Sequence, residues 1–189
     1  GGARPYFDTS LAVKAGADVV VLDGMQGGTA ASQDVFIDHV GIPTLACIRP
    51  AVDALNDLGM REEVQLIVSG GIRSGADVAK ALALGADAVS IGSAALIAIG
   101  DNDPKWETEY KELGTTAGAF DDWHLGNDPA GITTQDPELM KRVNPIKAGE
   151  RLANYLRVIT LEAQTIARAS GKSHLKNLEP EDLCALTVE

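Results

Sequence analysis

The stretch VQLIVSGGIRSG at residues 64–75 joins an apolar run of strand character to a double glycine and a polar turn, and a helical segment follows at residues 76–84. The same order repeats in AVSIGS at residues 88–93, before a second apolar helix that starts at Ala94. Neighbouring parallel strands end at one edge of a sheet, so we expect the two turns to bring two sets of backbone N–H groups to one place.

This repeated turn predicts a phosphate-binding site. Glycine lets the backbone approach an anion closely, and the N–H groups at a helix N-terminus favour negative charge. The donors would be Gly70, Gly71, Gly92 and Ser93. In (β/α)8 barrels the same arrangement follows the seventh and eighth strands. The alternative interpretation is two ordinary βα turns, in which glycine only relieves backbone strain.

The composition limits the class of protein. The chain has 189 residues, 16 basic and 27 acidic side chains and a net charge of -11, which argues against nucleic acid or an anionic membrane as the main partner. Its two cysteines, Cys47 and Cys184, have no neighbour at metal-ligand or disulfide spacing. No apolar run reaches the roughly 18 residues of a membrane helix. We therefore expect a cytoplasmic protein and, because the chain begins without methionine, a fragment.

The first half of the chain alternates strand and helix. Residues 17–23 are continuously apolar and β-branched, which predicts a strand buried on both faces. The glycine-rich loop GMQGGTAAS at residues 24–32 follows, and we expect Ser32 to cap the next helix. Residues 49–59 predict a helix with Pro50 at its start. Short crossovers of this kind predict parallel strands.

The second half is less regular. Residues 101–144 are polar and predict an irregular segment packed on the barrel, and residues 145–170 carry the three- and four-residue apolar steps of an amphipathic helix. The predicted division is therefore 1–100 for the barrel part, 101–144 for this segment and 145–189 for C-terminal helices. We expect the aromatic residues of the segment to attach it to the barrel: Trp106, Tyr110, Phe120 and Trp123.

Four motifs resemble the FMN-binding synthase domain of glutamate synthases. GMQGGTAAS at residues 24–32 is similar to G-x-D-G-G-T-G-A-S, and SGGIRSG at residues 69–75 is similar to D-G-G-[LI]-[RK]-[TS]-G. GSAA at residues 92–95 is similar to G-T-[AG]-P, and PAGITTQD at residues 129–136 is similar to P-x-G-[VI]-[AT]-T-Q-D. Their shared order along the chain makes the resemblance specific.

The resemblance implies an α/β fold: the C-terminal half of a (β/α)8 TIM barrel with a C-terminal helical extension, the first five strands lying outside this chain. It implies FMN as cofactor, and reductive amination of 2-oxoglutarate to glutamate or an N-substituted glutamate by hydride from reduced FMN. The implied partners are a 2-oxoglutarate- or glutamate-type small molecule and other synthase subunits, either glutaminase-like or electron-donating.

The resemblance also assigns residues. The FMN phosphate would be held by Gly70, Gly71, Gly92 and Ser93. Arg73 would add charge there or remain solvated. The flavin and keto-acid side would be lined by Gly27, Gly28, Thr29 and Ser32. The catalytic candidates are Asp23, at the end of a strand where barrel enzymes place their chemistry, and Gln26, which would hydrogen-bond a ring edge or the substrate carboxylate. The alternatives are a loop-orienting acceptor for Asp23 and a solvated amide for Gln26.

The chain departs from the family at two places. Family members place three cysteines before the P-x-G-[VI] motif, and residues 99–129 contain none, so we expect neither iron–sulfur ligands nor another metal site in this chain. The glycine-rich loop differs at Asp23, Met25, Gln26 and Ala30. These features are more similar to the separate glutamate-synthase-like subunits, including that of N-methylglutamate synthase.

Two other functions stay open. A non-catalytic scaffold subunit would keep the FMN-barrel structure while another chain performs the reaction, and the missing cluster cysteines favour it. A different phosphate-binding barrel is disfavoured. A 2-hydroxy-acid oxidase needs a histidine base near an arginine, and no such pair is visible. An inosinate-dehydrogenase-like enzyme needs a loop cysteine, and Cys47 lacks the glycine-rich setting of one.

Overall fold

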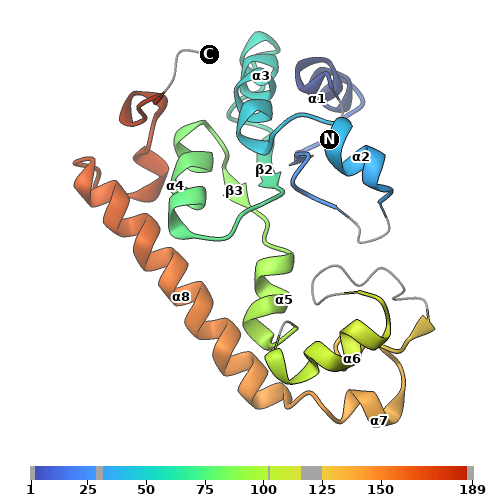
Figure 1. The fold of residues 1–189 in the computed structure, drawn as a ribbon. Helices are drawn as coiled ribbons and strands as arrows, with labels where there is room; N and C mark the ends of the chain where they lie inside the picture. The colour runs from blue at the N-terminus through green and yellow to red at the C-terminus, as the bar shows by residue number, and fades with distance from the viewer. Residues whose placement is uncertain (1–2, 29–31, 102, 116–124, 187–189) are drawn as a thin grey trace. The chain divides into compact units, whose positions relative to one another are not determined.

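Three parallel strands form one sheet in the computed structural model of the chain (Figure 1). The structure describes residues 3–28, 32–101, 103–115 and 125–186. The strands are β1 (Val19–Asp23), β2 (Gln65–Ser69) and β3 (Ala88–Val89), and β2 is the central one. Asp23 pairs with Ser69 and Val68 pairs with Val89, so the strands run to one carboxyl edge. The predicted parallel pairing is confirmed.

The chain divides into two compact units. The first contains Gly1–Gly28, Gln33–Ile91 and Val158–Glu189, and the second contains Thr29–Ser32 and Gly92–Arg157. The sheet lies in the first unit. The division at residues 100 and 144 that the sequence suggested stays a prediction.

Helices cover one face of the sheet in the first unit. In Figure 1, α3 (Thr44–Asp57) lies between α1 (Pro5–Lys14) and α4 (Gly75–Ala83). The core joins α3 to β2, and several of its side chains are fully buried: Cys47, Ile48, Ala51, Leu55, Leu66 and Val68. Each large aliphatic side chain buried in this way contributes roughly 1.5–3 kcal/mol to folding. This packing fixes the carboxyl edge of the sheet, where the predicted site lies.

The other face of β1 is not covered by the described residues. Val20 and Leu22 pack on the core, whereas Val19 and Val21 are 48% and 59% exposed. The prediction of a strand buried on both faces is therefore wrong for this part of the protein. The physical reason is that β1 is the edge strand of the described sheet, with β2 as its neighbour on one side.

Two helix starts differ from the predictions. α2 (Asp34–His39) begins after Gln33, which has extended backbone angles, so Ser32 is not its N-cap. α3 begins at Thr44, and Pro50 lies inside it rather than at its start. A proline in a helix removes one backbone hydrogen bond. The helix continues through Pro50 because the residues around it are buried against the sheet.

The second unit is more regular than its polar composition predicts. It contains α5 (Ser93–Ile99), a 3-10 turn η1 (Pro104–Trp106), α6 (Glu107–Glu112) and α7 (Pro137–Met140). Aspartates start two of these short elements. The Asp103 carboxylate accepts a hydrogen bond from the N–H of Lys105, and the Asp136 carboxylate accepts from the first turn of α7. Short helices are stable here because their orphan N–H groups have partners.

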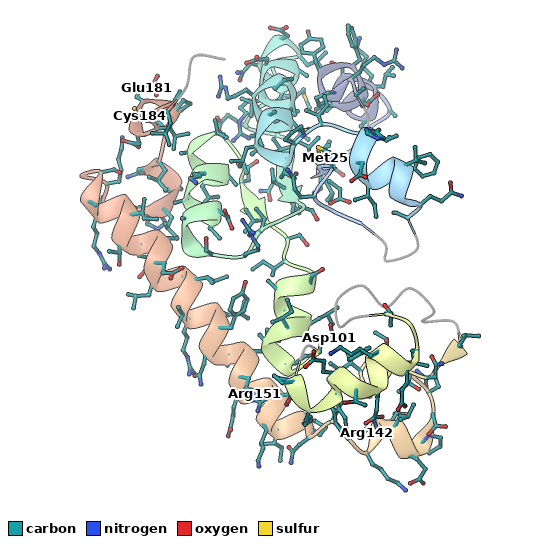
Figure 2. The ribbon with its side chains drawn as sticks, in the orientation of Figure 1. Met25, Asp101, Arg142, Arg151, Glu181 and Cys184 are labelled. Carbon is teal, nitrogen blue, oxygen red and sulfur yellow. The ribbon has the colours of Figure 1, made fainter. Side chains whose placement is uncertain are left out.

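Arg142 ties three segments of the second unit together (Figure 2). Its guanidinium lies 4.5 Å from the centre of the Trp106 ring. Its Nη1 donates to Glu109 Oε2 at 2.6 Å and to the carbonyl of Pro129 at 2.8 Å. Tyr110 is 2% exposed. The predicted aromatic anchors Phe120 and Trp123 lie outside the described residues.

The predicted C-terminal helix is confirmed as α8 (Pro145–Ala169). The short 3-10 turns η3 (Leu175–Asn177) and η4 (Pro180–Asp182) follow it, the second where the sequence predicts another short helix. None of the helices in the described ranges is long and apolar enough to cross a membrane.

Candidate functional site

The loop after β1 and the turn after β2 lie side by side at the carboxyl edge of the sheet. The N–H of Gly24 donates to the carbonyl of Ser69 at 3.0 Å, which extends the ladder by one residue. The N–H of Met25 (labelled in Figure 2) donates to the carbonyl of Ile42 at 2.9 Å, and the N–H of Gly27 donates to the carbonyl of Gly24 at 2.9 Å. The glycine-rich loop is therefore anchored on two sides in the first unit.

Gly70 and Gly71 both adopt the left-handed backbone, with φ of +105° and +73°. A Cβ on Gly70 would lie 2.7 Å from Thr44 Oγ1 and 2.9 Å from the N of Gly27. A Cβ on Gly71 would lie 2.8 Å from the Cβ of Gln26. Glycine is thus required at both positions for conformation and for space. Both the phosphate-binding interpretation and that of an ordinary βα turn fit this packing against loop 24–28.

The N–H groups of this turn face no acceptor in the described part of the chain. No hydrogen bond joins the N–H of Gly70, Gly71 or Ile72 to another described residue. Successive N–H groups beside left-handed residues form the concave arrangement that binds anions. Gly70 is half-buried and Ile72 is buried, whereas Gly71 is exposed; buried donors normally have partners. The turn therefore has the chemistry to hold a phosphate oxygen.

The N-terminus of α4, by contrast, is already occupied. Ser74 and Asp77 form a capping box, in which the Asp77 carboxylate accepts from the N–H groups of Arg73 and Ser74. The N–H of Gly75 donates to Glu162 Oε2 at 2.8 Å. An anion at this edge would therefore meet the Gly70–Gly71 turn rather than the first turn of α4.

Arg73 is largely exposed. Its Nε lies 3.7 Å from Asp77 Oδ2, and 79% of its side chain is accessible to solvent. An exposed pair of this kind contributes little to stability. Its predicted role as an added charge at the phosphate stays a prediction.

Asp23 ends β1 and lies against the glycine-rich loop. A Cβ on Gly27 would lie 2.2 Å from Asp23 Oδ1, so the loop passes directly over the carboxylate. Asp23 is exposed, and its strand partner Ser69 precedes the double glycine. The catalytic and the loop-orienting interpretations of Asp23 both fit this place in the fold.

Gln26 is held by Thr44, a residue that the sequence did not suggest. Gln26 Oε1 accepts from the backbone N and from Oγ1 of Thr44, both at 2.8 Å. Thr44 is 4% exposed and is the first residue of α3. The predicted site residue Gln26 is therefore bonded to the framework and is not a purely solvated amide.

The remaining predicted residues are placed less tightly. Gly28 is exposed in the first unit, and Thr29 lies outside the described residues. The second unit contains Ser32, Gly92 and Ser93. Gly92 comes directly before Ser93, the first residue of α5, and Gly92 and Ser93 are both exposed. Their roles in binding flavin stay predictions.

No group of three or more potential ligands that could hold a metal ion occurs in the described ranges. Cys47 lies on the buried side of α3, where burial raises the pKa of its thiol, and Cys184 is exposed. His39 is exposed on α2, and His174 accepts a hydrogen bond through Nδ1 at the start of η3. His124 lies outside the described residues. The expected lack of a cluster stays a prediction.

A second buried polar centre lies at Asp128, in the second unit. Its carboxylate is 1% exposed. It accepts from the N–H groups of Ala130, Ile132 and Thr133 at 2.8–3.0 Å, from Thr133 Oγ1 at 3.1 Å and from the Tyr110 hydroxyl at 2.8 Å. Asp128 thereby folds the PAGITTQD segment. An aspartate just before Pro-x-Gly is the one sequence signal that indicates such a turn.

The pKa values of this pair follow from its surroundings. Burial acts to raise the pKa of Asp128, but the hydrogen bonds from Thr133, Tyr110, Ala130 and Ile132 outweigh it and hold that pKa below its usual range. Burial, together with the hydrogen bond to Asp128, raises the pKa of Tyr110. The ionised aspartate and the neutral tyrosine are therefore the stable forms at neutral pH.

Comparison with known proteins adds to this geometry. The family described as the conserved region in glutamate synthase matches residues 4–105 and 117–173. A glutamate synthase large subunit-like protein of Rhizobium meliloti (strain 1021) is 82% identical over 189 residues, which are 100% of this chain and 43% of that protein. An archaeal-type glutamate synthase (NADPH) of Thermotoga neapolitana is 43% identical over 166 residues, which are 88% of this chain and 30% of that protein. The chain thus spans less than half the length of both relatives.

A solved structure confirms the fold class. A flavocytochrome b2 variant with sulfite bound matches with a TM-score of 0.57 and 18% identity, over 95% of this chain and 33% of that chain. At this identity the likeness concerns the fold alone. The predicted α/β class, part of a (β/α)8 TIM barrel followed by a helical extension, is confirmed.

Proposed function

Because this chain belongs to the glutamate synthase family, we propose that it forms part of an FMN-dependent oxidoreductase that reductively aminates 2-oxoglutarate to glutamate or an N-substituted glutamate. The chain covers 43% of its relative from Rhizobium meliloti. The amine and the electrons would therefore reach the site through other parts of the protein or through glutaminase-like or electron-donating subunits.

The observation that carries the proposal is the Gly70–Gly71 turn. Its two left-handed glycines and the N–H groups of residues 70–72 fit an FMN phosphate, because no described residue accepts from these donors. Gly92 and Ser93 would supply further donors. Arg73 would add charge at the rim.

Bound FMN would supply the hydride for reduction of the imine formed from 2-oxoglutarate and an amine. The residues of this chain would bind and orient. Gly27 and Gly28 would lie along the flavin with Thr29 and Ser32. Asp23 would exchange a proton at the substrate nitrogen, because it sits at the carboxyl end of a barrel strand.

The direct test compares FMN with riboflavin, which lacks the phosphate. Titration of the full-length protein should show FMN binding at least about 100-fold tighter, since two to three charge-assisted hydrogen bonds would be lost with riboflavin. Gly70→Ala should reduce that preference, because its Cβ would meet Thr44 and the N of Gly27.

Gly59→Ala is the matched control. Gly59 also has a positive φ, +66°, but a Cβ there has no atom within 4 Å, so the variant carries similar backbone strain away from the site. Equal affinity for FMN and riboflavin would place the phosphate elsewhere. A folded wild-type protein that binds neither would support the scaffold function instead.

A further inference from the structure

Thr44 occupies the junction of the three segments that build the candidate site. It begins α3, and its Oγ1 lies 2.8 Å from Gln26 Oε1 and 3.5 Å from the carbonyl of Ser69. A Cβ on Gly24 would lie 2.1 Å from the same hydroxyl. Thr44 thus contacts the loop after β1 and the end of β2 from a buried position.

The bonds to Thr44 fix the orientation of the Gln26 carboxamide. A backbone N–H only donates, so the Gln26 atom 2.8 Å from the N of Thr44 must be the carbonyl oxygen. The amide nitrogen lies on the other side of the carboxamide carbon. Gln26 is exposed, and no residue in the described ranges accepts a hydrogen bond from that nitrogen. Two N–H donors are therefore presented on the side of the loop away from Thr44.

We propose that Thr44 is a positioning residue that locks Gln26 with its amide nitrogen toward the ligand, so that Gln26 binds a carboxylate of the substrate. The two N–H donors of the amide need acceptors, and a carboxylate of the substrate offers two acceptor oxygens. This inference rests on the proposed function and specifies how its 2-oxo dicarboxylate is recognised.

Gln26→Glu tests the role of the amide nitrogen apart from that of the oxygen bonded to Thr44. A glutamate keeps an oxygen that accepts from Thr44, but it replaces the amide nitrogen with a second, charged oxygen. Such an oxygen repels a carboxylate. Thr44→Val is nearly isosteric and removes Oγ1 while keeping the backbone N–H. Thr44→Ser restores the hydroxyl, and Thr165→Val, on the exposed side of α8, is the control for the Thr-to-Val change.

The measurement is the affinity of the full-length protein first for FMN and then, in the oxidised FMN-loaded protein, for 2-oxoglutarate by perturbation of the flavin spectrum. We expect Gln26→Glu to weaken 2-oxoglutarate binding by about 100-fold or more, through loss of a charge-assisted hydrogen bond and added repulsion. FMN affinity should change less than about threefold, because the Thr44 bonds remain. Thr44→Val should weaken 2-oxoglutarate binding by about tenfold, since one of two locking bonds is lost.

The conservative variant distinguishes positioning from bulk packing. Thr44→Ser should bind 2-oxoglutarate like the wild type although it lacks the methyl group, and Thr165→Val should also match the wild type. Wild-type affinity in Gln26→Glu, or in Thr44→Val, would overturn the inference while leaving the proposed function in place. A loss of FMN affinity in Gln26→Glu would also overturn it, because Gln26 would then face the flavin.

A different result marks failure of the proposed function. Wild-type protein that binds FMN but not 2-oxoglutarate would contradict the proposed reaction, and the carboxylate assignment of Gln26 would fall with it. Wild-type protein without FMN would contradict the flavin site itself and, with it, the ligand assigned to Gln26. In both cases the wild-type protein alone reveals the failure, before any variant is compared.

Discussion

Replacement of Asp128 by asparagine should open the loop at residues 129–134. The carboxylate accepts five hydrogen bonds in a buried position, three of them from backbone N–H groups. Asparagine offers one acceptor oxygen and puts an NH₂ group, itself a donor, where the second oxygen was. The least costly orientation places this NH₂ beside Tyr110 and Ala130, because the Tyr110 hydroxyl can rotate to accept.

The magnitude follows from this geometry. The N–H of Ala130 would lose its acceptor, which costs about 1–3 kcal/mol for a buried group. The bonds from Ile132, the N–H of Thr133 and Thr133 Oγ1 would lose the charge of their acceptor, at about 0.5–1 kcal/mol each. The sum is about 2.5–6 kcal/mol. Tyr110→Phe removes the bond to Asp128 and the longer bond to the carbonyl of Asp101, and should cost about 1–2 kcal/mol.

Amide hydrogen exchange in the full-length protein measures the local opening of this loop. It does not require the whole protein to unfold in a single two-state transition. In Asp128→Asn the amides of Ala130, Ile132 and Thr133 should exchange about 10²–10⁴-fold faster, where the loop opens locally. Asp136→Asn is the matched control: this carboxylate is exposed and accepts two N–H groups at the start of α7, so about 1 kcal/mol is expected. Acceleration below about tenfold in Asp128→Asn, or equal to that of the control, would refute the reasoning.

The same loop should respond to acid with a defined sign. The pKa of Asp128 is held below its usual range in the folded protein, since its hydrogen bonds outweigh the effect of burial. The stabilisation is therefore fully present above the unfolded pKa of about 3.9 and is lost as the pH falls through the lower folded value. Protection of these amides should persist to about pH 4 and decline only below it. An Asp128→Asn protein should lack this decline.

Two further predictions concern the first unit. Asp23→Asn should leave the flavin content unchanged and slow turnover by roughly 10²-fold, if Asp23 exchanges a proton with the substrate; loss of flavin would show instead that it orients the glycine-rich loop. Gly75→Ala should destabilise the protein by about 1–3 kcal/mol in thermal or denaturant unfolding, because its Cβ would lie 2.5 Å from backbone atoms of Ile159 and Ala163. Gly149→Ala, in a helical position with no atom near the new Cβ, should instead stabilise by about 0.5–1 kcal/mol, and equal effects of the two changes would contradict the packing argument.

The glycine positions of the candidate site could be predicted from the sequence, because glycine marks places where the backbone needs positive φ or close approach. Gly70 and Gly71 need positive φ and close approach, and few other residues permit either. The order of strand, double glycine and helix also fixed the parallel sheet, since each turn ends at the same edge. Local chemistry was sufficient for these features.

The contacts of Thr44 and Asp128 could not be predicted from the sequence in the same way. Pro50 suggested a helix start near residue 49, which left Thr44 outside the predicted helix. The packing of α3 on β2 overrides that local preference and brings Thr44 to Gln26, 18 residues away. The bond between Tyr110 and Asp128 likewise joins residues 18 apart across a segment with weak periodicity. Such contacts depend on tertiary packing, which local patterns do not encode.

The apolar but exposed face of β1 is explained by the barrel to which this strand belongs. Val19 and Val21 lie on the face that helices do not cover, in register with Gln65 and Ile67 of β2. Parallel strands are normally covered on both faces, and in a (β/α)8 barrel the second face is filled by side chains of the other strands. The apolar run of β1 is therefore the run of a barrel strand, whose inner face we expect to be buried when further strands close the barrel. β1 is one of the two edge strands that would pair with those further strands, and it ends at Asp23, beside the proposed site.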